Sequence, residues 1–426
     1  MNSTVKRAII LLSVTLAITS LWIPAFAEGN SSVLTLMVYV TGSDLESTSG
    51  AATGDITEMM RSGVDTEKVN ISLCTGGAKR WQGGFPNDHV CFYQVEGRRP
   101  RQLESLDLIS MGEASTLSTF LNYSYEHFPA DQYALILWDH GGGPMNGVCF
   151  DELFSKNKTH DSLDLGELRT ALSDSPFNSE NPLEWIGFDA CLMSSVETAY
   201  ICAPFAKYMI ASQETEPGTG WEYSFLKQAS EGLSGDEMGK MIIGAYTDDS
   251  HASDLMLTLS CIDLSQLENV EKAMNDLFGN LDNMLSPDHF SEISNGRRDA
   301  KSFGRASTGS EYDLVDLFSL AEQYAAVQAD RAAELQSALE RTVIIHAGNQ
   351  ENSHGLSVYY PYYNKDYYKA LWSQQYSVWG FAEEYSSFMD HYADMWLGEQ
   401  LADWSDVRAK ALKPLQIGRA SCRERV

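Results

Sequence analysis

Short apolar runs, each closed by a polar or glycine-rich turn, recur through the first half of the chain. They lie at residues 33–40, 69–75, 133–138, 184–188 and 208–212. Runs of this length that are almost continuously apolar are typical of strands buried on both faces of a parallel sheet. We therefore expect five such strands in one sheet.

Helical patterns separate these runs. Apolar residues at steps of three and four predict amphipathic helices at 51–61, 114–128 and 165–172, and a further helix that begins near Leu192. Strands that alternate with helices build parallel sheets whose two faces are both covered. The fold class that follows is α/β, with a mainly parallel central sheet in an α/β/α sandwich.

The alternation weakens after about residue 224. A short strand of a peripheral hairpin is predicted at 90–95, and later strands at 255–263 and 355–361, whereas helices are predicted at 265–285, 312–339 and 379–397. We place a domain boundary near residue 264. It divides an α/β domain (28–264) from an α-rich C-terminal region (265–416).

Both ends of the chain differ from the rest. Lys6 and Arg7 precede an apolar stretch at 8–23, and Ala25-Phe26-Ala27 supplies small residues for a signal peptidase. An uncleaved anchor is disfavoured because about 16 apolar residues are short for a bilayer, which needs about 20. We expect a signal peptide (1–27) cleaved after Ala27, a secreted or extracytoplasmic protein and no stable membrane span thereafter.

The last ten residues, 417–426, read as a common short-read sequencing adapter translated in one frame. We expect this segment to be a sequencing artefact that replaces the natural chain beyond Gln416. An ordinary basic tail is the alternative.

Composition and charge narrow the partners. The chain is 43% hydrophobic and 21% charged, as soluble globular proteins are, and its formal net charge is −29. Such a surface repels nucleic acid and anionic membranes, and favours basic peptides or divalent cations. The alternative is that the charge only keeps an extracellular protein soluble. The cysteines form no C-x-x-C pair, so neither a structural zinc site nor a disulfide framework is predicted.

Two of the apolar runs lead directly into reactive side chains. His140 follows the run at 133–138, and Cys191 follows the run at 184–188. Because the carboxyl ends of parallel strands meet at one edge of a sheet, a thiol and an imidazole there suit nucleophilic catalysis. The predicted helix after Cys191 would favour a thiolate through its orphan amides and dipole. A buried inert thiol and a core histidine are the alternatives.

Three glycines at 141–143 follow the histidine directly. They let the backbone approach another molecule closely and expose amide donors of the kind that form an oxyanion hole. Asp139 is a poor third member of a triad because neighbouring strand residues point to opposite faces. The sequence provides no other orienting residue.

The residues around these two positions resemble the clostripain family of cysteine peptidases, which belongs to the caspase-like clan. The resemblance rests on His-Gly-Gly-Gly at 140–143, Phe-Asp-Ala-Cys-Leu-Met at 188–193, Met-Val-Tyr-Val at 37–40 and Thr-Gly-Gly at 75–77. It implies a caspase-like fold and a secreted endopeptidase that works through a thioester on Cys191 with His140 as partner. Backbone amides of Gly141 and Cys191 would hold the oxyanion.

The resemblance implies no cofactor for the chemistry, although members of the family can need calcium for maturation. Two other functions remain open. One is a transpeptidase that passes the same thioester to an amine, and the other is a catalytically silent peptide-binding module on the same fold.

Asp189 suggests a specificity. Residues two apart on a strand share a face, so Asp189 lies beside Cys191 and can line the pocket for the substrate residue before the scissile bond. A carboxylate there selects Arg or Lys, which matches the preference of the family. The alternative is that Asp189 caps a helix or accepts from a loop amide. Glu214 and Glu216 are candidates for another wall of this pocket or for a calcium site.

The polar segment 151–161 lies between the histidine and the cysteine and contains Lys156 and Lys158. Because relatives mature by cutting themselves, we expect an exposed loop cut at these lysines. A plain surface loop is the alternative.

Overall fold

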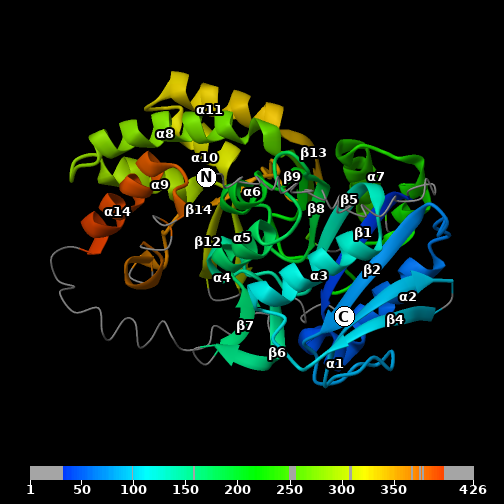
Figure 1. Cartoon of the computed structure of the whole chain (residues 1–426). Coiled ribbons are helices and arrows are strands. Elements are labelled where there is room, and N and C mark those ends of the chain that lie inside the picture. Colours follow the sequence, from blue (N-terminus) through cyan, green and yellow to red (C-terminus); the bar gives the residue numbers. More distant parts are fainter. Residues whose placement is uncertain are drawn as a thin grey trace, which may run out of the picture. The chain divides into compact units, whose positions relative to one another are not determined.

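The structure is a computed structural model (Figure 1). It describes residues 32–97, 99–156, 159–248, 256–306, 309–365, 368–373, 376 and 379–397. The expected signal peptide (1–27), Lys158 and the tail at 417–426 lie outside the described residues.

A central sheet of nine strands organises the described residues from Ser32 onward, in the order β13-β10-β9-β8-β5-β1-β2-β3-β4. Its middle consists of five mutually parallel strands: β1 (Ser32–Thr41), β2 (Val69–Gly76), β5 (Ala130–Trp138), β8 (Leu183–Asp189) and β9 (Ala206–Ala211). These are the five apolar runs of the sequence, and all five predicted strands are confirmed.

Antiparallel strands extend the sheet on both sides. They are β3 (Val90–Glu96) and β4 (Arg99–Leu106) beyond β2, and β10 (Thr258–Asp263) and β13 (Val343–Gly348) beyond β9. The hairpin predicted at 90–95 therefore belongs to the central sheet. The α/β class with a largely parallel sheet is confirmed.

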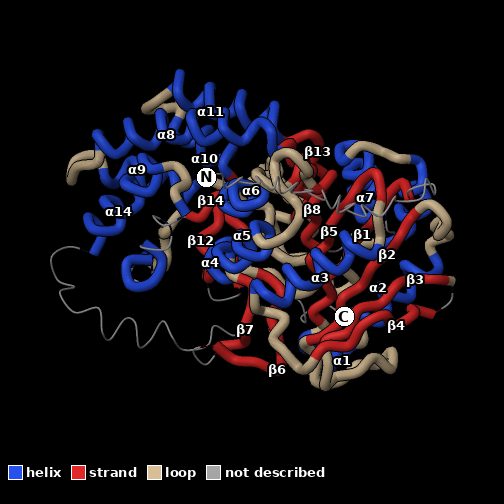
Figure 2. Tube along the Cα trace, viewed as in Figure 1, coloured by secondary structure: helices blue, strands red, loops and turns tan. Residues whose placement is uncertain are grey.

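Helices cover both faces of the sheet (Figure 2), because successive strand residues point to opposite sides. Met37 and Tyr39 pack into one core, and Leu36 and Val38 into the other. The first core includes α3 (Ala114–His127), α5 (Leu165–Ser173) and α6 (Val196–Cys202), and the second includes α2 (Ala51–Arg61), η1 (Tyr223–Glu231) and α7 (Gly235–Asp248).

The C-terminal region contains more than helices. Its helical elements are η3 (Leu264–Gln266), α8 (Leu267–Met284), α9 (Phe290–Asp299), α10 (Leu317–Tyr324), α11 (Ala329–Thr342), η4 (Tyr368–Trp372) and α14 (Glu383–Leu397). A three-stranded sheet joins them: β11 (Ser302–Ala306), β12 (Gly309–Asp316) and β14 (Ser357–Tyr359). The single helix predicted at 312–339 is wrong, because its first five residues lie in β12 and two helices follow.

The boundary near residue 264 stays a prediction. β13 comes from beyond it and pairs with β10 in the central sheet. Among the described residues, no helix combines the length and the apolar character needed to cross a bilayer.

Candidate active site

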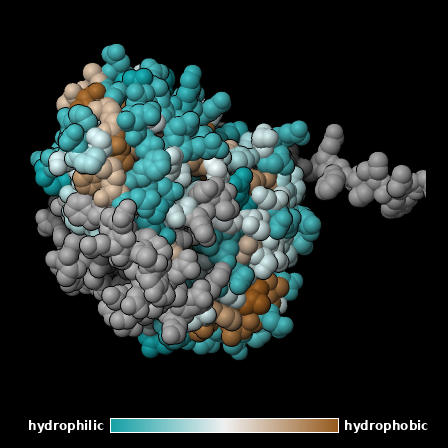
Figure 3. All heavy atoms as spheres, turned by 90° about the vertical axis from the view of Figure 1, so that its left-hand side faces the viewer, coloured by the Kyte–Doolittle hydropathy of each residue, from teal (hydrophilic) through white to brown (hydrophobic). Residues whose placement is uncertain are grey.

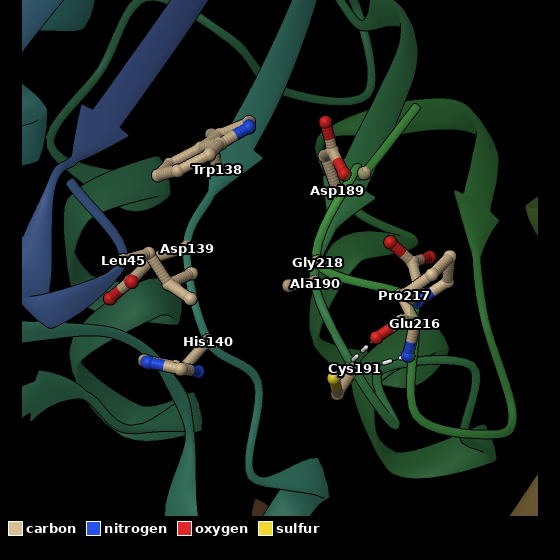
Figure 4. A pocket seen from close by; sticks show the side chains of 11 residues that line it. Leu45, Trp138, Asp139, His140, Asp189, Ala190, Cys191, Glu216, Pro217 and Gly218 are labelled. Carbon is tan, nitrogen blue, oxygen red and sulfur yellow. Dashed lines mark hydrogen bonds between the residues drawn. The ribbon is translucent and has the colours of Figure 1, made fainter. Parts of the chain in front are cut away.

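The ends of β5 and β8 bring His140 and Cys191 to one pocket. The two strands are parallel neighbours, with Trp138 and Asp189 as partners at their last paired position. His140 and Cys191 follow these positions and line the same pocket, together with Trp138, Asp189 and Glu216. Figure 4 shows the imidazole and the thiol on facing sides of this pocket. The two residues that the sequence paired thus meet in the structure.

Gly141 fits where a side chain could not. A Cβ atom built on it would lie 1.9 Å from the carbonyl oxygen of Cys191, far inside any contact distance. Only glycine allows the two backbones to approach this closely. The glycine therefore sets the spacing between the histidine strand and the cysteine turn.

The Gly141 amide is also left out of the neighbouring strand pairing. Gly141 forms an isolated antiparallel bridge with Val148, and the two hydrogen bonds of that bridge (3.3 and 2.8 Å) use backbone groups of the flanking residues. The bridge therefore does not occupy the Gly141 N–H, the first of the two donors expected for an oxyanion.

Cys191 lies in a turn and not at the start of a helix. The helix predicted from near Leu192 begins at Val196, with Ser195 as its N-cap, and Leu192 has a positive φ of 68°. The predicted stabilisation of a thiolate by the first turn of that helix is therefore wrong. Instead, the backbone N–H of Glu216 donates to Cys191 Sγ at 3.2 Å. A loop amide supplies the donor that the helix was expected to supply.

Asp44 is a neighbour of His140 that the sequence reasoning missed. Asp44 Oδ1 lies 2.8 Å from His140 Nε2 and comes from α1 (Ser43–Ser49), the helix that follows β1. β1 pairs with β5, so residues just beyond these two strands meet at the same sheet edge. An acidic residue directly after an apolar run was the available signal. The carboxylate can fix the ring and favour a proton on Nε2.

Asp139 serves a different purpose. Its carboxylate accepts from the Ser43 hydroxyl and from the Phe150 N–H, each at 2.5 Å. Burial raises its pKa to about 7. Asp139 therefore ties Ser43, at the start of the helix that carries Asp44, to Phe150 after the active site.

Asp189 lines the pocket and also accepts from a loop. It is 4% exposed, and its two oxygens accept from the Trp221 N–H at 3.2 Å and from the Tyr223 hydroxyl at 2.9 Å. Burial raises its pKa to about 7, against the lowering effect of these hydrogen bonds. The loop contact considered as the alternative is therefore present, and the same carboxylate lines the pocket. Its role in selecting the substrate residue stays a prediction.

Glu214 and Glu216 have different surroundings. Glu216 lines the pocket and contacts Cys191 through its backbone, whereas the Glu214 carboxylate accepts from the N–H groups of Thr215 (2.8 Å) and Gly304 (3.1 Å). The described residues contain no group of three or more His, Cys, Asp or Glu side chains arranged to hold a metal ion. The two glutamates therefore do not fit a shared calcium site.

Lys156 belongs to a strand of a β-hairpin. β6 (Val148–Lys156) pairs with β7 (Thr159–Leu163), so the exposed loop predicted over 151–161 is wrong for the described residues: they lie in strands, and Asp151 and Asp161 are buried. Lys156 ends β6, while Lys158 lies outside the described residues. A hairpin tip remains a suitable place for a protease to cut.

Comparison with known sequences gives two matches. A sequence profile described as the clostripain family (Peptidase C11) matches residues 38–407. Clostripain of Hathewaya histolytica is 22% identical over an alignment of 431 positions, gaps included. The alignment covers 84% of this chain and 80% of that protein.

Comparison with solved structures identifies proteins of similar fold. A secreted C11 cysteine protease from Bacteroides thetaiotaomicron, solved with an irreversible peptide inhibitor, has a TM-score of 0.61 and 18% identity over 84% of this chain and 99% of that one. An inactive zymogen C11 protease from Parabacteroides distasonis has a TM-score of 0.61 and 19% identity over 81% of this chain and 98% of that one.

Proposed function

Because the chain belongs to the clostripain family and is a cysteine peptidase, we propose that it is an endopeptidase that cleaves after Arg or Lys, with Cys191 as nucleophile and His140 as its partner. One observation carries this proposal. A thiol, an imidazole and a buried carboxylate, Asp189, line a single pocket at the carboxyl edge of the parallel sheet. These groups supply a nucleophile, a proton donor and a site for a cation.

The first step forms a thioester. The Cys191 thiolate attacks the carbonyl carbon of the scissile bond, and the oxygen gains the negative charge of a tetrahedral intermediate. N–H groups of Gly141 and Cys191 hold this oxygen. Collapse of the intermediate breaks the carbon–nitrogen bond, and His140 gives its proton to the leaving amine.

The second step releases the new carboxyl terminus. Neutral His140 takes a proton from a water molecule, which attacks the thioester and returns the thiolate. Asp44, 2.8 Å from Nε2, stabilises the imidazolium that each cycle forms. The other ring nitrogen, Nδ1, is the atom that exchanges the proton with substrate and water.

The carboxylate of Asp189 selects the side chain before the scissile bond. It comes from the same strand end as the nucleophile, and the loop at 213–223 holds it in place through Trp221 and Tyr223. Burial disfavours the charged form of a carboxylate, and a nearby opposite charge favours it. A cationic substrate side chain in the pocket therefore stabilises the carboxylate, whereas an uncharged side chain does not. Glu216 adds a second acidic residue to the lining.

Export and maturation complete the proposal. The segment at 1–27 directs secretion with cleavage after Ala27. Self-cleavage at Lys156 or Lys158 cuts the chain between His140 and Cys191, since both lysines match the proposed specificity. The proposal gives calcium no site at Glu214 and Glu216, because Glu216 lines the pocket whereas the Glu214 carboxylate accepts from the N–H groups of Thr215 and Gly304.

Peptides that differ only in the residue before a fluorogenic amide test the activity. We expect rapid release with Arg or Lys, little with Asn or Asp, and none from Cys191→Ala. Asp189→Asn should lose most activity on the basic substrates while alkylation of Cys191 by iodoacetamide continues. Cleavage that survives Cys191→Ala, or a preference for Asp over Arg, would refute the assignments.

A further inference from the structure

Another buried carboxylate, Asp55, lies next to the pocket that Asp189 lines. It belongs to α2 and is 6% exposed. Its Oδ2 accepts the indole N–H of Trp138 at 2.7 Å. Trp138 is the strand partner of Asp189, and Figure 4 shows the indole and that carboxylate on either side of the pocket. Asp55 therefore fixes the wall that faces Asp189.

Gly220 shows how close the two carboxylates are. A Cβ atom built on this pocket-lining glycine would lie 2.9 Å from Asp189 Oδ1 and 3.3 Å from Asp55 Oδ2. The Cβ position of residue 220 is thus close to both carboxylates, and any side chain there would lie against them. The positive φ of Gly220, 63°, gives a further reason for glycine here.

The pair lacks a basic partner among its main neighbours in the described part of the chain. Burial and the Asp189 charge raise the pKa of Asp55, and the strongest influences on either carboxyl group include no Lys or Arg. Two buried like charges cannot both ionise without a large cost. A cation that enters from the pocket would remove that cost, and a substrate side chain can supply one.

We propose that Asp55 is a specificity-determining residue that makes this pocket prefer Arg to Lys before the scissile bond. The inference rests on the function proposed above and narrows it. Arginine presents five N–H donors in a rigid plane, stacks on aromatic rings and is weakly hydrated, whereas the lysine ammonium is a compact, strongly hydrated charge. Asp55 acts by holding the Trp138 wall and by adding negative charge beside Asp189, so it is a positioning residue.

The variant Asp55→Asn separates charge from packing. Its amide oxygen can still accept the Trp138 N–H, but the charge is gone. For peptides that differ only in Arg or Lys, we expect kcat/KM to fall about 30-fold for Arg and only about 3-fold for Lys, mainly through KM; the difference corresponds to the loss of one charged interaction. Glu67→Gln, an equal charge change on the exposed loop after α2, should leave both values unchanged.

An Arg-to-Lys ratio that changes less than twofold in Asp55→Asn would overturn the proposal, as would an equal effect of Glu67→Gln. Thermal unfolding of each variant checks that the fold is intact. A fall in kcat at unchanged KM, equal for both substrates, would indicate a merely structural role and also contradict the proposal.

A second measurement does not depend on peptide cleavage. Butylguanidine and butylamine should protect Cys191 from iodoacetamide by filling the pocket, and butylguanidine should act at the lower concentration. Asp55→Asn should abolish this difference. If the wild-type enzyme cleaves after neither Arg nor Lys, the proposed function fails. The proposal for Asp55 fails separately if butylguanidine and butylamine protect Cys191 equally in the wild type, or if Asp55→Asn leaves the difference between them intact.

Discussion

The pair formed by Asp44 and His140 yields the first prediction. Asp44→Asn removes the charge that stabilises the imidazolium and loosens the ring. We expect kcat to fall on the order of 100-fold at nearly constant KM, the range typical of general acid–base catalysis. Initial rates at saturating substrate measure this effect.

Asp88→Asn is a matched control. Asp88 lies 3.0 Å from Nδ1 of His89 but is exposed on the surface, so its replacement should leave kcat unchanged. If Asp44→Asn keeps kcat within twofold of the wild type, Asp44 does not assist His140.

The sequence predicted His140 and Cys191 but not Asp44, for a physical reason. Each of the first two follows an apolar run and carries chemistry by itself, so local pattern is enough. Asp44 matters only because β1 and β5 are neighbours, and Asp44 lies 96 residues from its partner. The order of strands in a sheet is set by long-range packing, which a single local pattern does not encode.

The raised pKa of Asp189 predicts how specificity depends on pH. Burial raises that pKa to about 7, so the carboxyl group is neutral in acid and charged above this pH. Two peptides that differ only in the residue before the scissile bond, Arg in one and norleucine in the other, test this. The ratio of their kcat/KM values, Arg over norleucine, should rise as the pH rises through 7. Because Cys191 and His140 act on both substrates, their titration cancels in the ratio. In Asp189→Asn the rise should be much smaller but not absent, because Asp55 and Glu216 remain as acids near the pocket. A rise as large as in the wild type would contradict the assignment.

At the scale of elements, the sequence predicted best those strands that are buried on both faces. β1, β2, β5, β8 and β9 are apolar along almost their whole length, so their pattern is unambiguous. The hairpins β6–β7 and β11–β12 mix polar and apolar positions, and neither was predicted. The helix predicted from residue 312 begins only at Leu317, because Asp316 caps α10 by accepting from the Ser319 N–H at 2.8 Å and residues 312–316 lie in β12.

The β6–β7 hairpin connects the expected cutting site to the active site. The Cys149 N–H donates to the His140 carbonyl, and Glu152 Oε2 accepts from Ser47 on α1 at 2.6 Å. A cut at the tip would release strands that contact both His140 and the helix carrying Asp44. We expect the wild-type protein to give two fragments on a denaturing gel, and the Lys156→Gln/Lys158→Gln variant to give one chain of much lower activity.

Lys68→Gln, on an exposed side chain in the loop after α2, should be cut like the wild type. A double variant that stays uncut yet is as active as the wild type would separate cutting from activation. A wild-type protein that never splits would end the idea of self-cleavage.

At the scale of the whole molecule, acidic charge dominates. The net charge is −29, and hydrophilic residues cover most of the described surface that Figure 3 presents. Composition alone predicted a soluble chain, but it could not show that buried acids accompany the exposed ones. Asp139 and Asp189 are both buried at the pocket, where hydrophobic pattern predicted only strand ends. The buried carboxyl groups at the pocket therefore affect both the activity and the stability of the protein.

These buried acids predict that the free energy of unfolding falls as pH rises from about 4 to 8. Burial raises the pKa of Asp139 and of Asp189 to about 7 from 3.8, so the folded state binds their protons more tightly than the unfolded chain does. The stability they contribute is complete below about pH 4 and is lost as pH rises through 7, on the order of a few kcal/mol each. Repulsion among the surface carboxylates adds to this loss, and about 0.3 M salt should reduce only the surface part.

Urea unfolding at pH 5 and 8 measures the effect, and Asp139→Asn should show a shallower dependence on pH than the wild type. Unfolding free energies that rise over this range, or an equal dependence on pH in Asp139→Asn and the wild type, would contradict the raised pKa of these groups.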